Sequence, residues 1–141
     1  MRFYLDSMVW IYALEGNPHF GAASQALLRS IRAGGHTLLT SDFLLGEILV
    51  APVRKSDTFT IAAYRRMMLD SAAVEIVPFT ADTALHFATL RATLRTHPAD
   101  SLHLALAASG NADIFVTGDS KLSKLSVSGV GRVVDLSFQL H

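Results

Sequence analysis

The chain has 141 residues, of which 50% are hydrophobic and 17% charged, which suits one ordinary domain and excludes a disordered tail or a low-complexity linker. Twelve Lys and Arg residues balance twelve Asp and Glu residues, so the net charge provides no field that would attract nucleic acid or a membrane surface. Cysteine is absent, which excludes disulfides, zinc–thiolate sites and cysteine nucleophiles. We therefore expect a single domain over residues 1–141.

Short apolar runs alternate with amphipathic stretches along the chain. The predicted elements are, in order, a strand over 3–5, helices over 8–14 and 19–33, a strand over 37–40, helices over 41–50 and 58–70, a strand over 74–79, helices over 80–96 and 98–109, and strands over 113–117 and 132–136. Ser41 and Thr80 are expected to cap helices, Pro52 to close one and Pro98 to open one. Strands that alternate with helices pair in parallel, so the expected class is α/β, a three-layer α/β/α sandwich around a central, mainly parallel sheet.

Nothing in the sequence predicts contact with a membrane. The chain reaches an acid at Asp6 before any apolar core of signal-peptide length has formed. The longest apolar stretch, 43–53, is interrupted by Glu47 and Pro52 and is shorter than the roughly 20 residues that span a bilayer. We expect a soluble, cytoplasmic protein whose high apolar content indicates a surface buried against a partner.

Open parallel sheets bind ligands beyond the carboxyl ends of their strands, and two acids follow predicted strands there. Asp6 follows the first strand, and Asp119 lies two residues after Thr117, which ends another. Asp100 lies in the first turn of the helix that Pro98 opens. Taken singly, Asp6 and Asp100 are explained as acids that stabilise helix N-termini, and Asp119 as a turn residue.

Glu47 is harder to explain as an ordinary helical residue. Its neighbours three and four positions away are all apolar: Phe43, Leu44, Val50 and Ala51. Burying an unpaired carboxylate costs several kcal/mol, so such groups are paired, protonated or bound to a metal. Since no Lys or Arg lies within a helical turn, we predict that Glu47 has either a metal or a distant basic partner.

The four acids suggest one chemistry if the fold brings them to the same sheet edge. Carboxylates at close range raise one another's pKa unless a cation intervenes, and oxygen-only ligands suit Mg²⁺ or Mn²⁺ rather than zinc. The sequence contains no dinucleotide fingerprint, phosphate-binding loop, serine nucleophile elbow or H-E-x-x-H motif. His103, three residues after Asp100, is interpreted as an ordinary, hydrogen-bonded core or surface histidine.

Four segments together carry a family resemblance. They are a hydrophobic–Asp–Ser start at 3–12, an internal glutamate helix at 44–48, a Pro-x-Asp-x-x-x-x-Ala helix at 98–105, and a Thr-x-Asp sequence at 116–119. In this order, and over nearly the whole chain, they resemble the PIN-domain ribonucleases, specifically VapC-type toxins of type II toxin–antitoxin pairs. Each motif alone is loose, but the set is specific.

The resemblance implies an acidic quartet consisting of Asp6, Glu47, Asp100 and Asp119. Asp6, Asp100 and Asp119 correspond to ligands of Mg²⁺, or alternatively Mn²⁺, while Glu47 corresponds to a residue that binds metal or orients water. The resemblance also implies supporting hydroxyls, from Ser7 and Thr117.

The implied activity is Mg²⁺-dependent endoribonuclease cleavage of tRNA, rRNA or mRNA by a metal-activated water. The implied partners are an RNA substrate, a cognate antitoxin and a second copy of the chain, with the protein contacts on the helices between His19 and Asp70. Candidates for holding RNA are the basic residues Arg54, Lys55, Arg65, Arg66, Arg91, Arg95, Lys121 and Lys124.

Three other interpretations remain open. Met8 stands where the family usually has Asn or Ser, and a thioether cannot make that hydrogen bond, so a PIN-like module that binds nucleic acid or protein with weakened catalysis is one alternative. A nuclease acting on DNA or another phosphodiester is a second. An aspartyl-phosphate enzyme using Asp6 is a third, although its Asp-x-Asp motif would need an acid at position 8.

Overall fold

In the described residues, 1–69 and 71–141 of the computed structural model, five strands form one sheet in the order β3-β2-β1-β4-β5. Every neighbouring pair is parallel. The strands are β1 (Arg2–Leu5), β2 (Thr37–Thr40), β3 (Val74–Ile76), β4 (Ile114–Val116) and β5 (Arg132–Val134). The first strand of the chain therefore lies at the centre of the sheet, and the order of strands reverses beside it.

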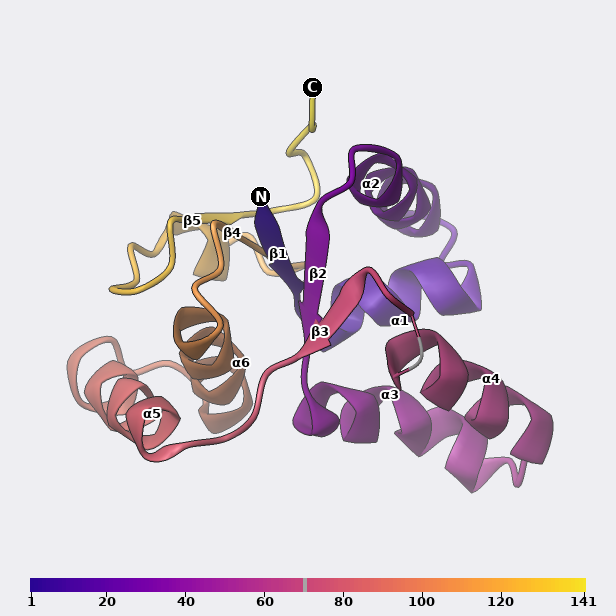
Figure 1. Ribbon diagram of the computed structural model, residues 1–141, viewed down its shortest axis with the longest axis horizontal. Helices are drawn as coiled ribbons and strands as arrows, with labels where there is room; N and C mark the ends of the chain where they lie inside the picture. Colours follow the sequence, from indigo (N-terminus) through magenta and orange to yellow (C-terminus); the bar gives the residue numbers. More distant parts are fainter. Residues whose placement is uncertain (70) are drawn as a thin grey trace.

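Helices cover both faces of this sheet. They are α1 (Ser7–Glu15), α2 (Gly21–Ala33), α3 (Asp42–Arg54), α4 (Thr58–Leu69), α5 (Ala81–Thr93) and α6 (Pro98–Ser109). Helices α1 to α4 lie on one side of the sheet and α5 and α6 on the other (Figure 1). The predicted α/β/α sandwich with a parallel sheet is confirmed. Asp70, at which the fourth predicted helix ends, lies outside the described residues.

The prediction that Pro52 closes its helix is wrong, because α3 continues to Arg54 with Pro52 inside it. Proline lacks only its own backbone N–H, and the carbonyls of Ala51 and Pro52 still accept hydrogen bonds. Lys55 N–H donates to the Ala51 carbonyl (3.2 Å) and Asp57 N–H to the Pro52 carbonyl (2.9 Å). The buried proline ring is thus accommodated in the last turn, where few helical bonds remain to be lost.

Four predicted elements end earlier in the structure, and two of them are the strands expected over 113–117 and 132–136, which stop at Val116 and Val134. The strand expected over 74–79 stops at Ile76. Val77 N–H still donates to the Thr40 carbonyl (2.8 Å), but β2 ends at Thr40 and offers no further partner. The helix expected over 80–96 stops at Thr93, and Arg95 adopts the left-handed backbone region at φ 50°. A short 3₁₀ helix, η1 (Leu122–Lys124), was not predicted.

The core is organised around β1, whose Phe3, Tyr4 and Leu5 side chains are completely buried. Tyr4 lies in register with Leu39 of β2 and Phe115 of β4. Pairing continues one residue beyond the strand, since Asp6 N–H donates to the Val116 carbonyl at 2.9 Å. The sheet therefore places Asp6 rigidly at its carboxyl edge. Among the described helices, none has the length and apolar character needed to cross a membrane.

Candidate active site

Asp6 ends β1 and caps α1. Its Oδ1 accepts hydrogen bonds from the backbone N–H groups of Met8 (3.0 Å) and Val9 (3.3 Å), and the residue is only 7% exposed. Burial raises the pKa of the Asp6 carboxyl, and the Thr117 hydroxyl and the Val9 N–H oppose that shift without cancelling it. The carboxylate is thus kept largely out of water, where a cation would stabilise it.

The charge of Asp119 acts on Asp100 at the same edge. Burial, and then the negative charge of Asp119, raise the pKa of Asp100, with a smaller contribution from Glu47. Asp100 is half-buried in the first turn of α6, whereas Asp119 is exposed in the loop after β4. Asp119 also has the predicted turn role, because its Oδ1 accepts from Lys121 N–H at 2.8 Å.

Glu47 projects from α3 and contacts His103 of α6. The carboxylate Oε1 and the imidazole Nε2 are in hydrogen-bond contact across 56 positions of sequence, so the predicted distant partner of a basic residue type is confirmed. The side chain of Glu47 is 30% exposed, so it is half-buried rather than enclosed by its apolar neighbours. Partial burial acts to raise the pKa of Glu47, but His103, assisted by Ser7, outweighs burial and leaves the pKa lowered.

His103 is the buried, hydrogen-bonded histidine that the sequence indicated, at 3% exposure, but its contact with Glu47 was not predicted. Its Nδ1 lies 2.8 Å from the Tyr4 hydroxyl, which in turn lies 3.0 Å from the Ser41 hydroxyl. The spacing of Tyr4 and His103 from two of the acids could have indicated this set of contacts. Tyr4 is two residues before Asp6 on the same face of a strand, and His103 is three residues after Asp100 on a helix.

The two hydroxyls expected to support the site lie beside its acids. Thr117 is fully buried, accepts from Asp119 N–H at 3.0 Å, and lowers the pKa of Asp6 against the effect of burial. A hydrogen bond from Ser7 likewise lowers the pKa of Glu47 against the effect of burial. Met8 contributes its backbone N–H to the Asp6 cap, while its side chain is 43% exposed.

The donor set fits a hydrated divalent cation. The quartet offers carboxylate oxygens. Burial raises the pKa of Asp6, and burial together with the negative charge of Asp119 raises the pKa of Asp100, and a cation would relieve both. Across residues 1–69 and 71–141, no group of three or more His, Cys, Asp or Glu side chains is arranged to hold an ion. Mg²⁺ keeps several of its waters when it binds, so acids that do not form a closed cage can hold it partly through those waters.

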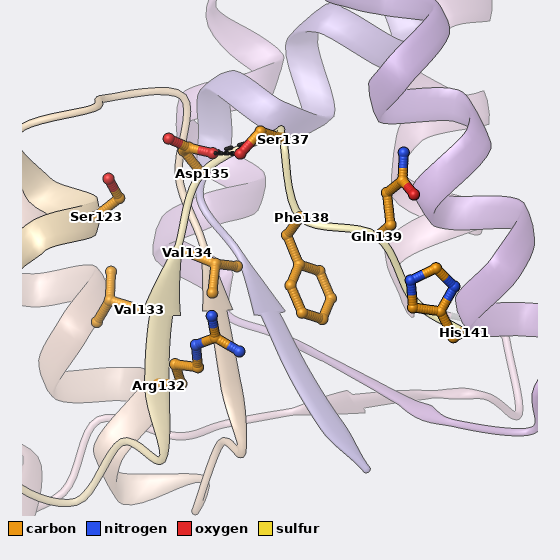
Figure 2. A pocket seen from close by; sticks show the side chains of 9 residues that line it. All are labelled: Ser123, Arg132, Val133, Val134, Asp135, Ser137, Phe138, Gln139 and His141. Atoms are coloured by element: carbon orange, nitrogen blue, oxygen red, sulfur yellow. Dashed lines mark hydrogen bonds between the residues drawn. The ribbon is translucent and has the colours of Figure 1, made fainter.

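The open hollow of about 530 Å³ beside β5 is a separate feature. Figure 2 shows its lining from β5 and the C-terminal segment, including Arg132, whose guanidinium carbon lies 5.9 Å from the centre of the Phe138 ring. Asp135 accepts from the Ser137 hydroxyl (2.5 Å) and N–H (2.9 Å) in the same view. None of the four predicted acids lines this hollow, so it is not part of the candidate active site.

The basic residues predicted to hold RNA are all exposed, but they differ in their surroundings. Lys121 adjoins the carboxyl edge, because it is two residues after Asp119 in the same turn. Arg91 is engaged within the protein, donating to the Thr96 carbonyl between α5 and α6. Lys121 is therefore the candidate best placed to meet a substrate at the acids.

Comparison with known proteins places these features in a family. The model of the PIN domain matches residues 3–127, which include all four acids. In fold the chain is similar to a chain of the crystal structure of VapBC2 from Rickettsia felis bound to a DNA fragment from their promoter. That match has a TM-score of 0.73 and 20% sequence identity, and it covers 96% of this chain and 98% of the other. No curated protein matches the sequence.

Proposed function

The chain belongs to the PIN-domain family, whose members are generally nucleases, and we propose that it is a Mg²⁺-dependent endoribonuclease that acts as the toxin of a type II toxin–antitoxin pair. One observation carries the proposal. Asp119 of the loop after β4 and Glu47 of α3 both raise the pKa of Asp100 of α6, and Asp6 follows β1 at the same sheet edge.

In this proposal Asp6, Asp100 and Asp119 hold the ion, and Mn²⁺ can replace Mg²⁺. When bound, the ion lowers the pKa of a coordinated water and stabilises charge on the scissile phosphate. Thr117 contacts the Asp119 backbone and keeps Asp6 oriented, and Ser7 supports Glu47. Glu47 orients the attacking water, and Lys121 provides positive charge for the RNA backbone.

The proposed partners are a cognate antitoxin and a second copy of the chain. The similar structure from Rickettsia felis is of VapBC2, and helices α3 and α4 here expose apolar side chains suited to a protein partner. Phe59 is 83% exposed, Val53 56% and Val50 46%. These residues lie within the span from His19 to Asp70 in which the protein contacts were expected.

The test is RNA cleavage by the purified protein. Total tRNA and mRNA are incubated with Mg²⁺, with Mn²⁺ and with EDTA, beside the variants Asp6→Asn and Asp100→Asn. We expect EDTA to stop cleavage and each substitution to lower its rate by about a hundredfold or more, because metal-held charge stabilises the transition state by several kcal/mol.

Asp113→Asn is the matched control. This acid lies at the opposite edge of the sheet, where its carboxylate accepts from Arg2 N–H at 2.7 Å, and its loss should leave the cleavage rate unchanged. Cleavage that survives Asp6→Asn would contradict the active-site assignment. Binding of RNA without cleavage under any metal condition would favour the alternative, a PIN-like binding module.

A further inference from the structure

A buried chain of hydrogen bonds runs behind the acids and joins three of the elements that carry them. The Tyr4 hydroxyl of β1 lies between Ser41 Oγ (3.0 Å) and His103 Nδ1 (2.8 Å), and His103 Nε2 contacts Glu47. Ser41 and Glu47 belong to the same helical segment, so the contacts form a closed loop through β1, α6 and α3. We call these four residues the Tyr–His loop.

Three of the four members of the Tyr–His loop are buried. Tyr4 is fully buried, Ser41 and His103 are each 3% exposed, and aromatic rings enclose the pair. The Tyr4 ring stacks on Phe115 with centroids 5.5 Å apart and planes 7° from parallel, and the His103 ring lies 4.9 Å from Phe43. Satisfied polar networks in a low-dielectric interior hold their members in one arrangement.

Ser41 connects the loop to the start of α3. Its hydroxyl caps that helix by accepting from Leu44 N–H at 3.1 Å, and the same oxygen contacts Tyr4. The position of α3 and the orientation of the Glu47 side chain are therefore fixed by one set of contacts. Each side of the loop also lies close in sequence to an acid, since Tyr4 precedes Asp6 by two residues and His103 follows Asp100 by three.

We propose that His103, held by Tyr4, is a positioning residue that aims the Glu47 carboxylate at the ion and water of the active site. This inference rests on the proposed function, because it concerns the same site. Histidine uses both ring nitrogens here, one toward Tyr4 and one toward Glu47, whereas Asn and Gln each match only one of these positions. Outer contacts of this kind typically change metal affinity or activity by about 10- to 100-fold when removed.

Two substitutions separate the two contacts of His103. Gln can reach the position of Nε2 and keep a hydrogen bond to Glu47, whereas Asn reaches only the position of Nδ1 and keeps the contact with Tyr4. We expect His103→Asn to lower kcat for RNA cleavage and Mn²⁺ affinity about tenfold or more, with little change in KM, and His103→Gln to retain more of both. Melting temperatures of the two variants identify any loss that follows stability alone.

A double substitution tests whether His103 acts through Glu47. If it does, His103→Asn should add little to the loss already caused by Glu47→Gln, because the residue that it positions is gone. His36→Phe is the control, because His36 packs against Phe3, at 5.4 Å between ring centroids, outside the Tyr–His loop. The proposal would be overturned if His103→Asn and His103→Gln lost equal amounts of kcat and Mn²⁺ affinity in step with their melting temperatures. It would also be overturned if the losses of the two single variants multiplied in the double variant.

The contact can also be tested in the metal-free protein, independently of any RNA cleavage. The ring nitrogen resonances of His103 should shift in Glu47→Gln and stay in place in Glu75→Gln, whose site is at the far edge of the sheet. A protein that cleaves no RNA but shows this shift and the tenfold change in Mn²⁺ affinity would retain the positioning role and lose the proposed function. Unchanged resonances in Glu47→Gln would contradict the positioning role even in an active nuclease.

Discussion

At one edge of the sheet the pKa of an acidic residue is lowered, and at the other edge the pKa of two acidic residues is raised. At the amino edge the Arg2 guanidinium donates to both carboxylate oxygens of Glu75 (2.9 and 2.8 Å), and its Nε donates to the Gly110 carbonyl (2.9 Å). The hydrogen bond from Arg2 is the main reason that the pKa of Glu75 is lowered. At the carboxyl edge burial raises the pKa of both Asp6 and Asp100.

The acid at the amino edge is stabilised by a basic side chain of the protein, whereas two acids at the carboxyl edge are not. Within residues 1–69 and 71–141, Arg2–Glu75 is the one contact within 4 Å between a Lys or Arg and a carboxylate, so no acid of the quartet has such a partner. His103 supports Glu47, but Asp6 and Asp100 remain with unfavourable burial. Perturbed groups of this kind gather at functional sites, where another species completes their environment. Three measurements test the contrast.

The largest expected effect is stabilisation by divalent ions at the carboxyl edge alone. An ion that binds only the folded protein stabilises it by about 2.7 kcal/mol at a hundred times its Kd, which corresponds to a rise in Tm of roughly 5–10 °C for a domain of this size. Thermal denaturation with increasing Mn²⁺ measures the rise. The rise in Tm should disappear in Asp6→Asn and persist in Glu75→Gln. An undiminished rise in Tm in Asp6→Asn would show that Asp6 does not bind the ion.

An intermediate effect is expected without metal. Asn caps a helix as well as Asp does, so Asp6→Asn should keep the bonds to Met8 and Val9 while removing a buried charge. We expect the free energy of unfolding to rise by about 0.5–2 kcal/mol, as is common when a functional site is relieved of strain. Urea denaturation in EDTA measures it. Asp42→Asn, an exposed acid at the start of α3, should give no gain, and a loss of stability in Asp6→Asn would contradict the contrast between the edges.

The smallest effect concerns pH at the amino edge. Because the pKa of Glu75 is lowered in the folded protein, its pair with Arg2 stabilises the fold above the ordinary glutamate pKa of about 4.3, and that contribution is lost as pH falls through the lower folded value. Since both side chains are partly exposed, Glu75→Gln should reduce stability by only about 0.2–1 kcal/mol at pH 7. Urea denaturation at pH 7 and pH 3 should show the gap closing in acid, and an equal gap at both would contradict this account.

The sequence predicted the parts of the molecule that depend on local pattern. Asp6 and Asp100 could be placed because each adjoins the end of a strand or the start of a helix, and alternation of elements alone indicates a parallel sheet. The full extent of β2 and of α6 also followed from local signals. These features depend on periodicity and capping, which neighbouring residues determine.

Other features depend on contacts that no local pattern contains. The partner of Glu47 is 56 residues away, and only the packing of α6 beside α3 brings His103 to it. The continuation of α3 past Pro52 likewise depends on later N–H groups that satisfy the carbonyls around the proline. The exposure of Glu47 was misjudged because its apolar neighbours do not all face the core: Val50 is itself 46% exposed, and the side chain of Glu47 is 30% exposed.

The capping role of Asp6 has an evolutionary consequence. Because Asn would supply the same helix cap and relieve the buried charge, selection for a folded protein gives this acid no protection. Under the proposed function, selection for metal binding is what keeps Asp at position 6. A lineage released from that selection would pass easily to a well-folded, inactive copy that could still bind the proposed protein partners, so inactive relatives of this chain should be recognised by Asn at this position rather than by a damaged fold.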